Sequence, residues 1–433
     1  MTESVWDEFE WRGMIYEATD GVRDVLAREA VTCYIGFDPT ASSLHVGSLL
    51  PLMALARLQR HGHRPIAIAG GGTGMIGDPS GKTQERQLLG LDRIEENLRG
   101  IRVQLERFLD FDTPANPARI VNNADWLAPL RLMEFLRDTG KHFTVNAMLA
   151  RESVRRRLES EDGISYTEFT YSLLQAYDFL TLYDRYGCTL QLGGSDQWGN
   201  ILSGADLIRK LRGAKAHGLV MPLVTTASGV KFGKTEAGTV WLDPSRTSPF
   251  RFYQFWLNTE DGDVGRYLRY FTFLDRDAIA ALEERVREAP ERREAQRALA
   301  GEVTALLHGA DGLARAERAT AVLFGGDLSA LAADEVLEVF DDVPSTALAR
   351  SEFEGSGKAV TDLLVVSGLA ASKGEAARLV RQGGVYLNNR RVEGDRDRVT
   401  AGQAIGGELL VLRKGAKQNH VIRIAEGAAP ARG

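Results

Sequence analysis

Residues 31–74 read VTCYIGFDPTASSLHVGSLLPLMALARLQRHGHRPIAIAGGGTG, and this stretch decides the fold. Residues 31–37 are a short apolar run rich in β-branched and aromatic residues, so they predict a buried strand. After a polar break, apolar residues recur at helical spacing as far as Gln59, which predicts a helix beginning near His45. Ser42 or Ser43 is expected to cap this helix.

Residues 65–69 predict a second strand that runs into a glycine-rich turn. Strand, helix and strand at this spacing form a βαβ unit, which requires a parallel sheet. Residues 189–192 predict a further strand, which ends at Gly193-Gly194 and is followed by a helical stretch. Ligands of parallel sheets bind at the carboxyl ends of the strands, and most of the unusual motifs of this chain fall there.

The second half of the chain has a different pattern. The pattern of residues 248–341, with few β-branched residues, predicts mostly helices, and residues 342–355 resemble a linker. From residue 356 onward two short amphipathic helices are followed by strands around a hairpin turn at Asn388-Asn389. A chain of 433 residues exceeds the size of a single core, so two or three domains are expected.

Charge is distributed unevenly along the chain. Residues 356–433 hold 13 Lys and Arg against 7 Asp and Glu, a balance of +6, which leaves −12 for the rest of a chain whose net charge is −6. A basic tail on an acidic body suggests one module that faces RNA or another anion. The two distant cysteines give neither a disulfide framework nor a metal cluster. The acidic N-terminus lacks the pattern of a signal or transit peptide, so a cytoplasmic protein is expected.

Three motifs could carry chemistry. GDPSGKT (residues 77–83) resembles a phosphate-binding P-loop, but the spacing between its glycines is too short, so a P-loop NTPase is rejected. HVGS (residues 45–48) opens a helix, where free N–H groups favour a phosphate; the alternative is a histidine that only caps the helix. KFGKT (residues 231–235) places two of the ten lysines around a glycine, as in a mobile anion clamp; the alternative is a solvated turn.

Together, HVGS and KFGKT resemble the two signature motifs of the class I aminoacyl-tRNA synthetases. Five longer segments resemble the tyrosyl-tRNA synthetase pattern in particular. They are YIGFDPTA (34–41), GDPSGK (77–82), YSLLQAYD (171–178), QLGGSDQWGN (191–200) and TSPFRFYQFW (247–256). The tail from about Lys358 resembles the S4-type RNA-binding domain of the bacterial enzymes. The resemblance covers nearly the whole chain, in order.

This resemblance implies an α/β protein with three parts. A Rossmann-like parallel-sheet catalytic domain would span residues 1–245 and end with the KFGKT loop. An α-helical anticodon-binding domain would span residues 246–341. After the linker at 342–355, a small α+β S4-like domain would span residues 356–433.

The resemblance also implies roles for single residues. Tyr34 and Asp178 would hydrogen-bond the phenolic hydroxyl of tyrosine, while Asp78, Tyr171 and Gln175 would hold its ammonium group. Gln197 would lie near the reacting carboxylate. The nucleotide would contact Gly36, Asp38, Gly47, Gly194 and Asp196. The phosphates would contact Thr40, His45, Lys82, Arg86, Lys231, Lys234 and Thr235, and these residues together with Ser48 would form the catalytic set.

Two positions depart from the family pattern. The first signature usually ends in His or Asn, whereas this chain has Ser48, a shorter side chain that would reach the nucleotide only through water. Ile35 stands where some relatives have a cysteine that touches the ribose. We expect both changes to be tolerated, at a cost of at most about 1–2 kcal/mol each, the scale of a single hydrogen bond.

The implied partners are L-tyrosine, ATP with Mg²⁺ on its phosphates, tRNA(Tyr) and a second copy of the chain. No structural metal, membrane or DNA is expected. Tentative tRNA contacts in the tail are Lys373, Arg378, Arg381, Arg390 and Arg391. Three alternatives stay open: a synthetase of the tryptophan type, another nucleotidyltransferase, and an RNA-binding protein built on an inactive synthetase scaffold.

Overall fold

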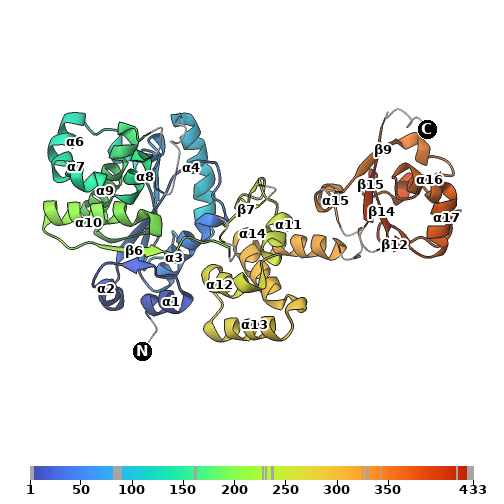
Figure 1. Ribbon diagram of the computed structural model, residues 1–433, viewed down its shortest axis with the longest axis horizontal. Helices are drawn as coiled ribbons and strands as arrows, with labels where there is room; N and C mark the ends of the chain where they lie inside the picture. Colours follow the sequence, from blue (N-terminus) through green and yellow to red (C-terminus); the bar gives the residue numbers. More distant parts are fainter. Residues whose placement is uncertain are drawn as a thin grey trace. The chain divides into compact units, whose positions relative to one another are not determined.

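The structure is a computed structural model that describes residues 4–80, 90–159, 163–226, 229, 232–235, 238–323, 325, 326, 328, 331–341, 343–415 and 418–426. The chain forms two compact units, drawn as ribbons in Figure 1. Unit 1 comprises Met1–Ser248 and Phe255–Gly309, and unit 2 comprises Pro249–Gln254 and Ala310–Gly433. The expected helical domain, residues 246–341, is therefore shared between the two units.

A six-stranded sheet forms the centre of unit 1, with the order β1-β6-β5-β2-β3-β4. All neighbours from β6 to β4 are parallel, and β1 is antiparallel to β6 at the edge. The strands are β1 (Glu17–Ala18), β2 (Thr32–Phe37), β3 (Arg64–Ala69), β4 (Arg119–Asn122), β5 (Cys188–Gly194) and β6 (His217–Met221). The strand order reverses between β2 and β5, and such a switch point is where open α/β sheets bind ligands.

The predicted βαβ unit is confirmed. Strands β2 and β3 pair in parallel register, with Tyr34 beside Ile66, and helix α3 (Leu49–Arg60) packs on both strands. Eight of the twelve residues of α3 are Leu, Met or Ala, and these apolar side chains are buried against the sheet. Apolar periodicity was therefore a sufficient guide to this part of the fold.

The start of this helix differs from the prediction. A short 3₁₀ turn, η1 (Val46–Ser48), precedes α3, and the His45 side chain caps it by accepting a hydrogen bond from the Gly47 N–H. The expectation that Ser42 or Ser43 caps the helix is wrong. Ser43 is buried, its hydroxyl donates to the Leu44 carbonyl, and the same oxygen accepts hydrogen bonds from elsewhere in unit 1.

Further helices surround the sheet and extend the unit. Helices α9 and α10 pack on each other, and both of them, like α3, pack on β5. Besides α3, the α-helices described within the first 212 residues are α1 (Val5–Arg12), α2 (Val22–Arg28), α4 (Leu91–Leu105), α5 (Ala124–Leu127), α6 (Leu132–Asp138), α7 (Val145–Leu149), α8 (Glu152–Leu158), α9 (Tyr166–Tyr186) and α10 (Trp198–Arg212). A two-stranded hairpin follows, made of β7 (Lys234–Thr235) and β8 (Gly238–Thr239).

The region predicted to be mostly helical is confirmed as such. It contains α11 (Pro249–Leu257), α12 (Asp261–Phe271), α13 (Arg276–Glu288), α14 (Glu294–Leu323) and α15 (Ala333–Val339). Helix α14 is interrupted at Gly309, whose φ of 73° and ψ of 178° are not helical. A residue with a side chain rarely adopts this positive φ, so glycine permits the break at which unit 1 ends.

Unit 2 contains a five-stranded sheet with the order β12-β11-β14-β15-β9. Its strands are β9 (Ser345–Ala349), β11 (Val385–Leu387), β12 (Arg390–Arg391), β14 (Leu409–Lys414) and β15 (Gln418–Ala425). Strands β10 (Lys358–Ala359) and β13 (Arg398–Val399) form a separate pair beside helices α16 (Val360–Val366) and α17 (Lys373–Arg381). The predicted turn at Asn388-Asn389 is confirmed, since both residues have positive φ.

The segment expected to be a linker, residues 342–355, is part of this fold. Strand β9 pairs in parallel with β15, its partner from the far end of the chain, and Leu348 and Phe353 are buried in the core of the unit. The mostly small and polar residues of the segment resemble those of a linker. Pairing across more than 70 residues is a tertiary effect, which local composition does not reveal.

Candidate functional site

A cavity of about 340 Å³ opens at the carboxyl ends of β2, β3 and β5, where the strand order reverses. Fourteen residues that the sequence singled out line it. They are Tyr34, Gly36, Asp38, Thr40, His45, Gly47, Ser48, Asp78, Tyr171, Gln175, Asp178, Gly194, Asp196 and Gln197. The structure thus brings together residues from distant motifs.

Five further predicted residues are not placed here. Lys82, Arg86 and Lys231 lie outside the described residues, and of Lys234 and Thr235 only the backbone, in β7, is described. The side chains that line the cavity in the described part of the chain include four carboxylates and no Lys or Arg. This lining suits an ammonium group and hydroxyl groups.

At the buried end of the cavity, Tyr34 and Asp178 are 1% and 3% exposed. The Tyr34 hydroxyl has no hydrogen-bond partner among the described residues, although its ring packs edge-on against Phe179. Burial raises the pKa of Tyr34 well above its ordinary value, and the nearby charge of Asp178 adds to this. The phenol of Tyr34 therefore stays protonated and is available to donate to, or accept from, a hydroxyl group that enters the cavity.

Asp178 is held by two side chains that the sequence reasoning missed. Asn123 Nδ2 donates to one carboxylate oxygen at 2.9 Å, and Trp126 Nε1 donates to the other at 2.7 Å. Burial raises the pKa of Asp178 to about 7 and outweighs these two hydrogen bonds, which act in the opposite direction. Asn123 directly follows strand β4, so its place at a carboxyl strand end was the one available signal.

Gln191 was also missed as a site residue. It lies on β5 directly beside Tyr34 on β2, is 2% exposed, and lines the cavity. Its Oε1 atom has no hydrogen-bond partner among the described residues. A glutamine in the middle of an otherwise apolar strand was the signal that could have identified it.

A network of amide and carboxylate groups forms another wall. Gln197 Nε2 donates to Asp78 Oδ2 at 2.7 Å, and Gln175 Nε2 donates to Gln197 Oε1 at 3.2 Å. Asn200, a fourth missed residue, donates to Gln175 Oε1 at 3.1 Å. Asp78 also accepts from the backbone N–H of Ser80. The network fixes the carboxylate of Asp78 where a bound cation could pair with it.

Asp38 continues this polar wall toward the cavity mouth. Thr73 Oγ1 donates to Asp38 Oδ1 at 3.2 Å, and the Tyr171 hydroxyl donates to Asp38 Oδ2 at 3.5 Å. The backbone of Gly70 lies so close that an added Cβ would be 2.5 Å from Asp38 Oδ1. A glycine is required there because any side chain would displace the carboxylate.

The cavity mouth is formed by the HVGS motif at the start of η1 and α3. His45 Nδ1 accepts from the Gly47 N–H at 3.0 Å, so the neutral imidazole carries its proton on Nε2. The ring folds closely over Gly47, where an added Cβ would be 2.6 Å from the imidazole. His45 is exposed and presents a donor beside a helix N-terminus, an arrangement that favours phosphate.

The two signature motifs are in contact. An added Cβ on Gly233 of the KFGKT segment would be 2.5 Å from Val46 Cγ2 of HVGS. The Gly233 carbonyl accepts from Val240 N–H, and the Val240 carbonyl accepts from Val46 N–H, both at 3.1 Å. The His45 and Trp241 rings lie edge to face, 6.2 Å apart. The second signature therefore lies against the mouth of the cavity.

Comparison with known proteins identifies the family to which the chain belongs. A family model described as tRNA synthetases class I (W and Y) matches residues 26–325, and one described as the Tyrosine--tRNA ligase SYY-like C-terminal domain matches residues 335–422. The tyrosine–tRNA ligase of Roseiflexus castenholzii is 57% identical over 421 residues, which are 97% of this chain and 99% of that protein. The tyrosine–tRNA ligase of Bacillus caldotenax is 52% identical, over 96% of this chain and 99% of that protein.

Among solved structures, a C-terminally truncated mitochondrial tyrosyl-tRNA synthetase from Aspergillus nidulans has the same fold. Its TM-score is 0.68 at 34% sequence identity, over 74% of this chain and 94% of that one. The two family models together match residues 26–325 and 335–422, and the three relatives named above are all tyrosine–tRNA ligases or tyrosyl-tRNA synthetases. This chain therefore belongs to the class I tRNA synthetases of the tryptophan and tyrosine family, within its bacterial-type tyrosyl-tRNA synthetases.

Proposed function

We propose that this protein is a tyrosine–tRNA ligase. It activates L-tyrosine with ATP to tyrosyl-adenylate and pyrophosphate, and then transfers the tyrosyl group to the 3′-terminal ribose of tRNA(Tyr). The observation that carries the proposal is the pair of buried polar groups, Tyr34 and Asp178, at the closed end of a cavity whose mouth is the HVGS motif. The identity of 57% to a tyrosine–tRNA ligase over nearly the whole chain supports the same substrate.

In this proposal the tyrosine side chain enters the buried end of the cavity. Its hydroxyl meets Tyr34 and Asp178, and its ammonium group meets Asp78, Tyr171 and Gln175. A site that leaves buried polar groups unpaired with phenylalanine rejects it by about 10⁵-fold, a magnitude established on tyrosyl-tRNA synthetases themselves. An editing step is therefore unnecessary.

ATP binds at the mouth. Gly36, Asp38, Gly194 and Asp196 face the adenosine. Apart from its two chain neighbours, no atom of the described residues lies within 4 Å of the place where a Cβ of Gly36 would be, which leaves room for the nucleotide. Thr40, His45, Gly47 and Ser48 face the phosphates, where the Nε2 proton of His45 stabilises the charge that develops on the α-phosphate. The positive charges that balance the polyphosphate come with Mg²⁺, which enters as part of the substrate, and from Lys82, Arg86, Lys231 and Lys234, with Thr235 beside them.

The reaction needs no covalent enzyme intermediate. The tyrosine carboxylate, near Gln197, attacks the α-phosphorus, a new C–O–P linkage forms, and pyrophosphate leaves with the electron pair of the broken P–O bond. The chain supplies orientation, which is worth up to about 7–11 kcal/mol, and fixed hydrogen-bond donors, worth about 3–4 kcal/mol for one key donor. The 3′-terminal ribose hydroxyl of tRNA then displaces AMP from the adenylate.

For tRNA we propose two binding regions. Residues 246–341 contact the anticodon stem-loop, and residues 356–433 contact another part of the tRNA through phosphates and shape. The tentative contacts Lys373, Arg378 and Arg381 are exposed on α17, and Lys373 and Arg381 form ion pairs with Asp362 and Asp395 that a phosphate could replace. Exposed cations of this kind bind the RNA backbone without sequence preference.

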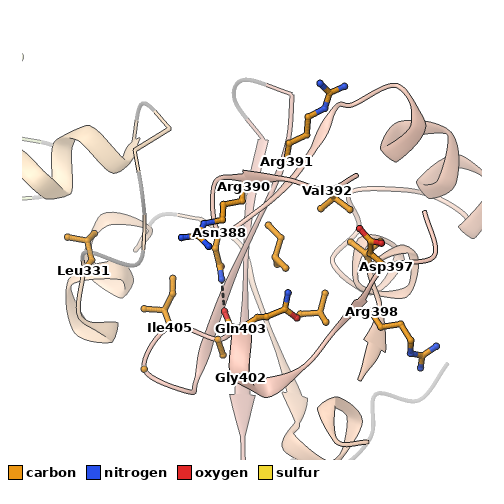
Figure 2. Close-up of a pocket in the computed structure, with 15 residues that line it drawn as sticks. Leu331, Asn388, Arg390, Arg391, Val392, Asp397, Arg398, Gly402, Gln403 and Ile405 are labelled. Atoms are coloured by element: carbon orange, nitrogen blue, oxygen red, sulfur yellow. Dashed lines mark hydrogen bonds between the residues drawn. The ribbon is translucent and has the colours of Figure 1, made fainter. Parts of the chain in front are cut away.

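Arg390 and Arg391 of β12 support the second region in a different way. Both are exposed and line a pocket of about 550 Å³ in unit 2. Figure 2 shows Arg390 beside Asn388, whose side chain is tied to the Gln403 carbonyl, whereas Arg391 points away from it. Two neighbouring arginines that point in different directions can contact two separate phosphates.

We further propose that the protein is a cytoplasmic homodimer. Seven of the twelve exposed large apolar residues of the described chain fall between residues 132 and 166: Leu132, Met133, Leu136, Val145, Leu149, Leu158 and Tyr166. Such a concentration favours a protein interface. Among the helices that the structure describes, none combines the length and apolar composition needed to cross a bilayer. Sedimentation velocity tests the dimer, and a monomer mass at micromolar concentration contradicts it.

The main alternative is a synthetase of the tryptophan type, because the matched family includes both kinds. The indole of tryptophan offers no hydroxyl to the Tyr34–Asp178 pair, which favours tyrosine. An RNA-binding protein on an inactive scaffold is disfavoured by the fourteen predicted site residues that line the cavity.

ATP–pyrophosphate exchange is the test of the proposal. Purified protein, MgATP and labelled pyrophosphate are combined with tyrosine, phenylalanine or tryptophan in turn. We expect exchange with tyrosine alone. Exchange with tryptophan would overturn the interpretation of the buried pair, and no exchange with any amino acid would favour the inactive scaffold.

A further inference from the structure

One apolar residue of the KFGKT segment is buried, although its neighbours in sequence are polar. Phe232 lies between Lys231 and Gly233, and its side chain is 5% exposed. Its ring is stacked on Phe271 with centroids 5.5 Å apart and planes 9° from parallel. It also meets the rings of Tyr267 at 4.9 Å, Phe255 at 5.5 Å and Trp256 at 5.7 Å. These four partners belong to α11 and α12.

The next residue is pressed against the first signature motif. Gly233 has a φ of 81°, and its backbone lies where a Cβ would be 2.5 Å from Val46 Cγ2. Through Val240 the backbone hydrogen bonds continue to Val46. Phe232 and Gly233 are adjacent in the chain. The aromatic rings of α11 and α12 therefore contact one residue of this pair, and Val46 of the HVGS motif contacts the other.

Helix α12 also holds the chain before this segment. The side chains of Arg266 and Tyr267 both donate to the Thr225 carbonyl, at 2.7 and 3.2 Å. Tyr267 therefore contacts the chain at two points, through its hydroxyl at Thr225, before the KFGKT segment, and through its ring at Phe232 within it. A buried aromatic ring has one well-packed position, so it defines where the backbone lies more closely than a solvated side chain does.

We propose that Phe232 is a positioning residue for the ATP-dependent step. Its burial among the α11–α12 aromatic rings holds Gly233 against Val46 and so fixes the backbone of Phe232 and Gly233, which stand in sequence between the two lysines of the motif. Phe232 does not touch the substrate in this inference and acts through the backbone. The inference depends on the proposed function only in that the reaction uses ATP at the HVGS motif.

The test compares Phe232→Ala and Phe232→Met with the control Phe9→Ala. Phe9 is a fully buried ring of helix α1 that does not line the cavity. We expect Phe232→Ala to lower kcat/KM for ATP in pyrophosphate exchange between about tenfold and 100-fold, the scale of a small misplacement of reacting groups. KM for tyrosine should stay unchanged, because the tyrosine end of the cavity lies on β2 and α9. Methionine is apolar and adaptable, so Phe232→Met should restore most of the activity.

The control separates positioning from general stability. Phe9→Ala should lower the unfolding temperature by an amount comparable to Phe232→Ala, without changing KM for ATP. An unchanged KM and kcat for ATP in folded Phe232→Ala, or an equal effect of Phe9→Ala, would overturn the inference. If Phe232→Ala does not fold, the comparison is made with Phe232→Leu and Phe9→Leu. Absence of exchange by the unmodified protein would instead refute the proposed function.

Discussion

Two side-chain oxygens, Tyr34 Oη and Gln191 Oε1, are buried without a hydrogen-bond partner among the described residues, and the two residues are partners on the neighbouring strands β2 and β5. Leaving a buried polar group unpaired costs about 1–3 kcal/mol. A ligand that supplies a hydroxyl at this place removes that cost, and a ligand without one does not. At the scale of the residue, selectivity for tyrosine thus arises from buried polar atoms that have no partner among the described residues until the ligand binds.

The first prediction concerns Tyr34→Phe. Removal of the unpaired hydroxyl should leave the unfolding free energy equal or raise it slightly, because no hydrogen bond within the described structure is lost. Tyrosine should bind about tenfold more weakly, since one hydrogen bond of about 1.4 kcal/mol is lost. Urea unfolding and the KM for tyrosine in pyrophosphate exchange measure both effects. A large loss of stability would contradict the interpretation that this hydroxyl is reserved for the ligand.

The second prediction follows from the pKa of Asp178, which burial raises to about 7 from an ordinary value of 3.8. Between these pH values the folded chain keeps a proton that the unfolded chain has lost, so the contribution of this carboxyl to stability must fall as the pH rises. Asp178→Asn is neutral throughout and lacks this dependence. The stability of the unmodified protein relative to the variant should therefore fall by about 2 kcal/mol between pH 5 and pH 7.

Urea unfolding of both proteins at these two pH values measures the difference. Comparison with the variant cancels the contributions of all other titrating groups. Parallel stability profiles for the two proteins would show that Asp178 is ionised in the fold throughout this range, and the buried end of the cavity would then carry a full negative charge.

At the scale of the element, the carboxyl end of α12 is held by two arginines from other helices. Arg12 of α1 and Arg57 of α3 both donate to the carbonyl of Thr272, directly after the helix. Arg57 is fully buried, and Glu8 contacts both guanidinium groups, at 2.8 and 3.2 Å. Helix ends have unpaired carbonyls, so this cluster satisfies a need of α12 and joins it to the helix that begins at the HVGS motif.

The third prediction is that Glu8→Gln destabilises unit 1 by about 3–5 kcal/mol, the usual result of leaving a buried charge without its partner. Burial opposes ionisation of Glu8, but the hydrogen bond from His61 and the charges of Arg57 and Arg12 lower its pKa to about 2. Its stabilising effect is therefore complete above the ordinary pKa of 4.5 and is lost as the pH falls toward 2.

Thermal unfolding at pH 7 measures the effect of this substitution. Glu10→Gln, an exposed change on the same helix, is the matched control and should alter stability by less than about 0.5 kcal/mol. Equal unfolding temperatures for the two variants would show that the arginine cluster does not depend on Glu8.

At the scale of the whole molecule, the division of the chain into units 1 and 2 determines where a truncation leaves unit 1 intact. Removal of residues 356–433 would take β15 from its parallel partner β9 and expose the apolar residues Leu348 and Phe353. A cut after Leu323, at the end of α14, removes the whole sheet of unit 2 and keeps all of unit 1.

The fourth prediction is that a chain of residues 1–323 keeps pyrophosphate exchange with tyrosine but charges tRNA(Tyr) at least about tenfold less efficiently, because RNA affinity depends mainly on contacts to phosphates. The missing part includes the segment with a charge balance of +6. Exchange and charging are measured on the same preparations at one salt concentration, with the full chain as the control. Undiminished charging would exclude a role of residues 324–433 in tRNA binding.

Much of the fold and of the candidate site could be predicted from the sequence, because the relevant signals are local. Apolar periodicity identified β2, α3 and β3, and ordered motifs identified fourteen residues that the fold brings to one cavity. The cap of α3 could not be predicted in this way. His45 occupies that position because Ser43 is engaged by Gln104 and Asp243, which are distant in sequence.

By itself, the sequence determined the class of fold, the family and the chemical nature of the site, since these depend on residue types at fixed spacings. Only the tertiary structure decided how the groups interact: Asn123 and Trp126 on Asp178, Phe232 among aromatic rings, and β9 beside β15. Each of these contacts joins residues more than 20 positions apart in the chain. Burial, pKa and strand pairing depend on such neighbours in space, which no local pattern of residues specifies.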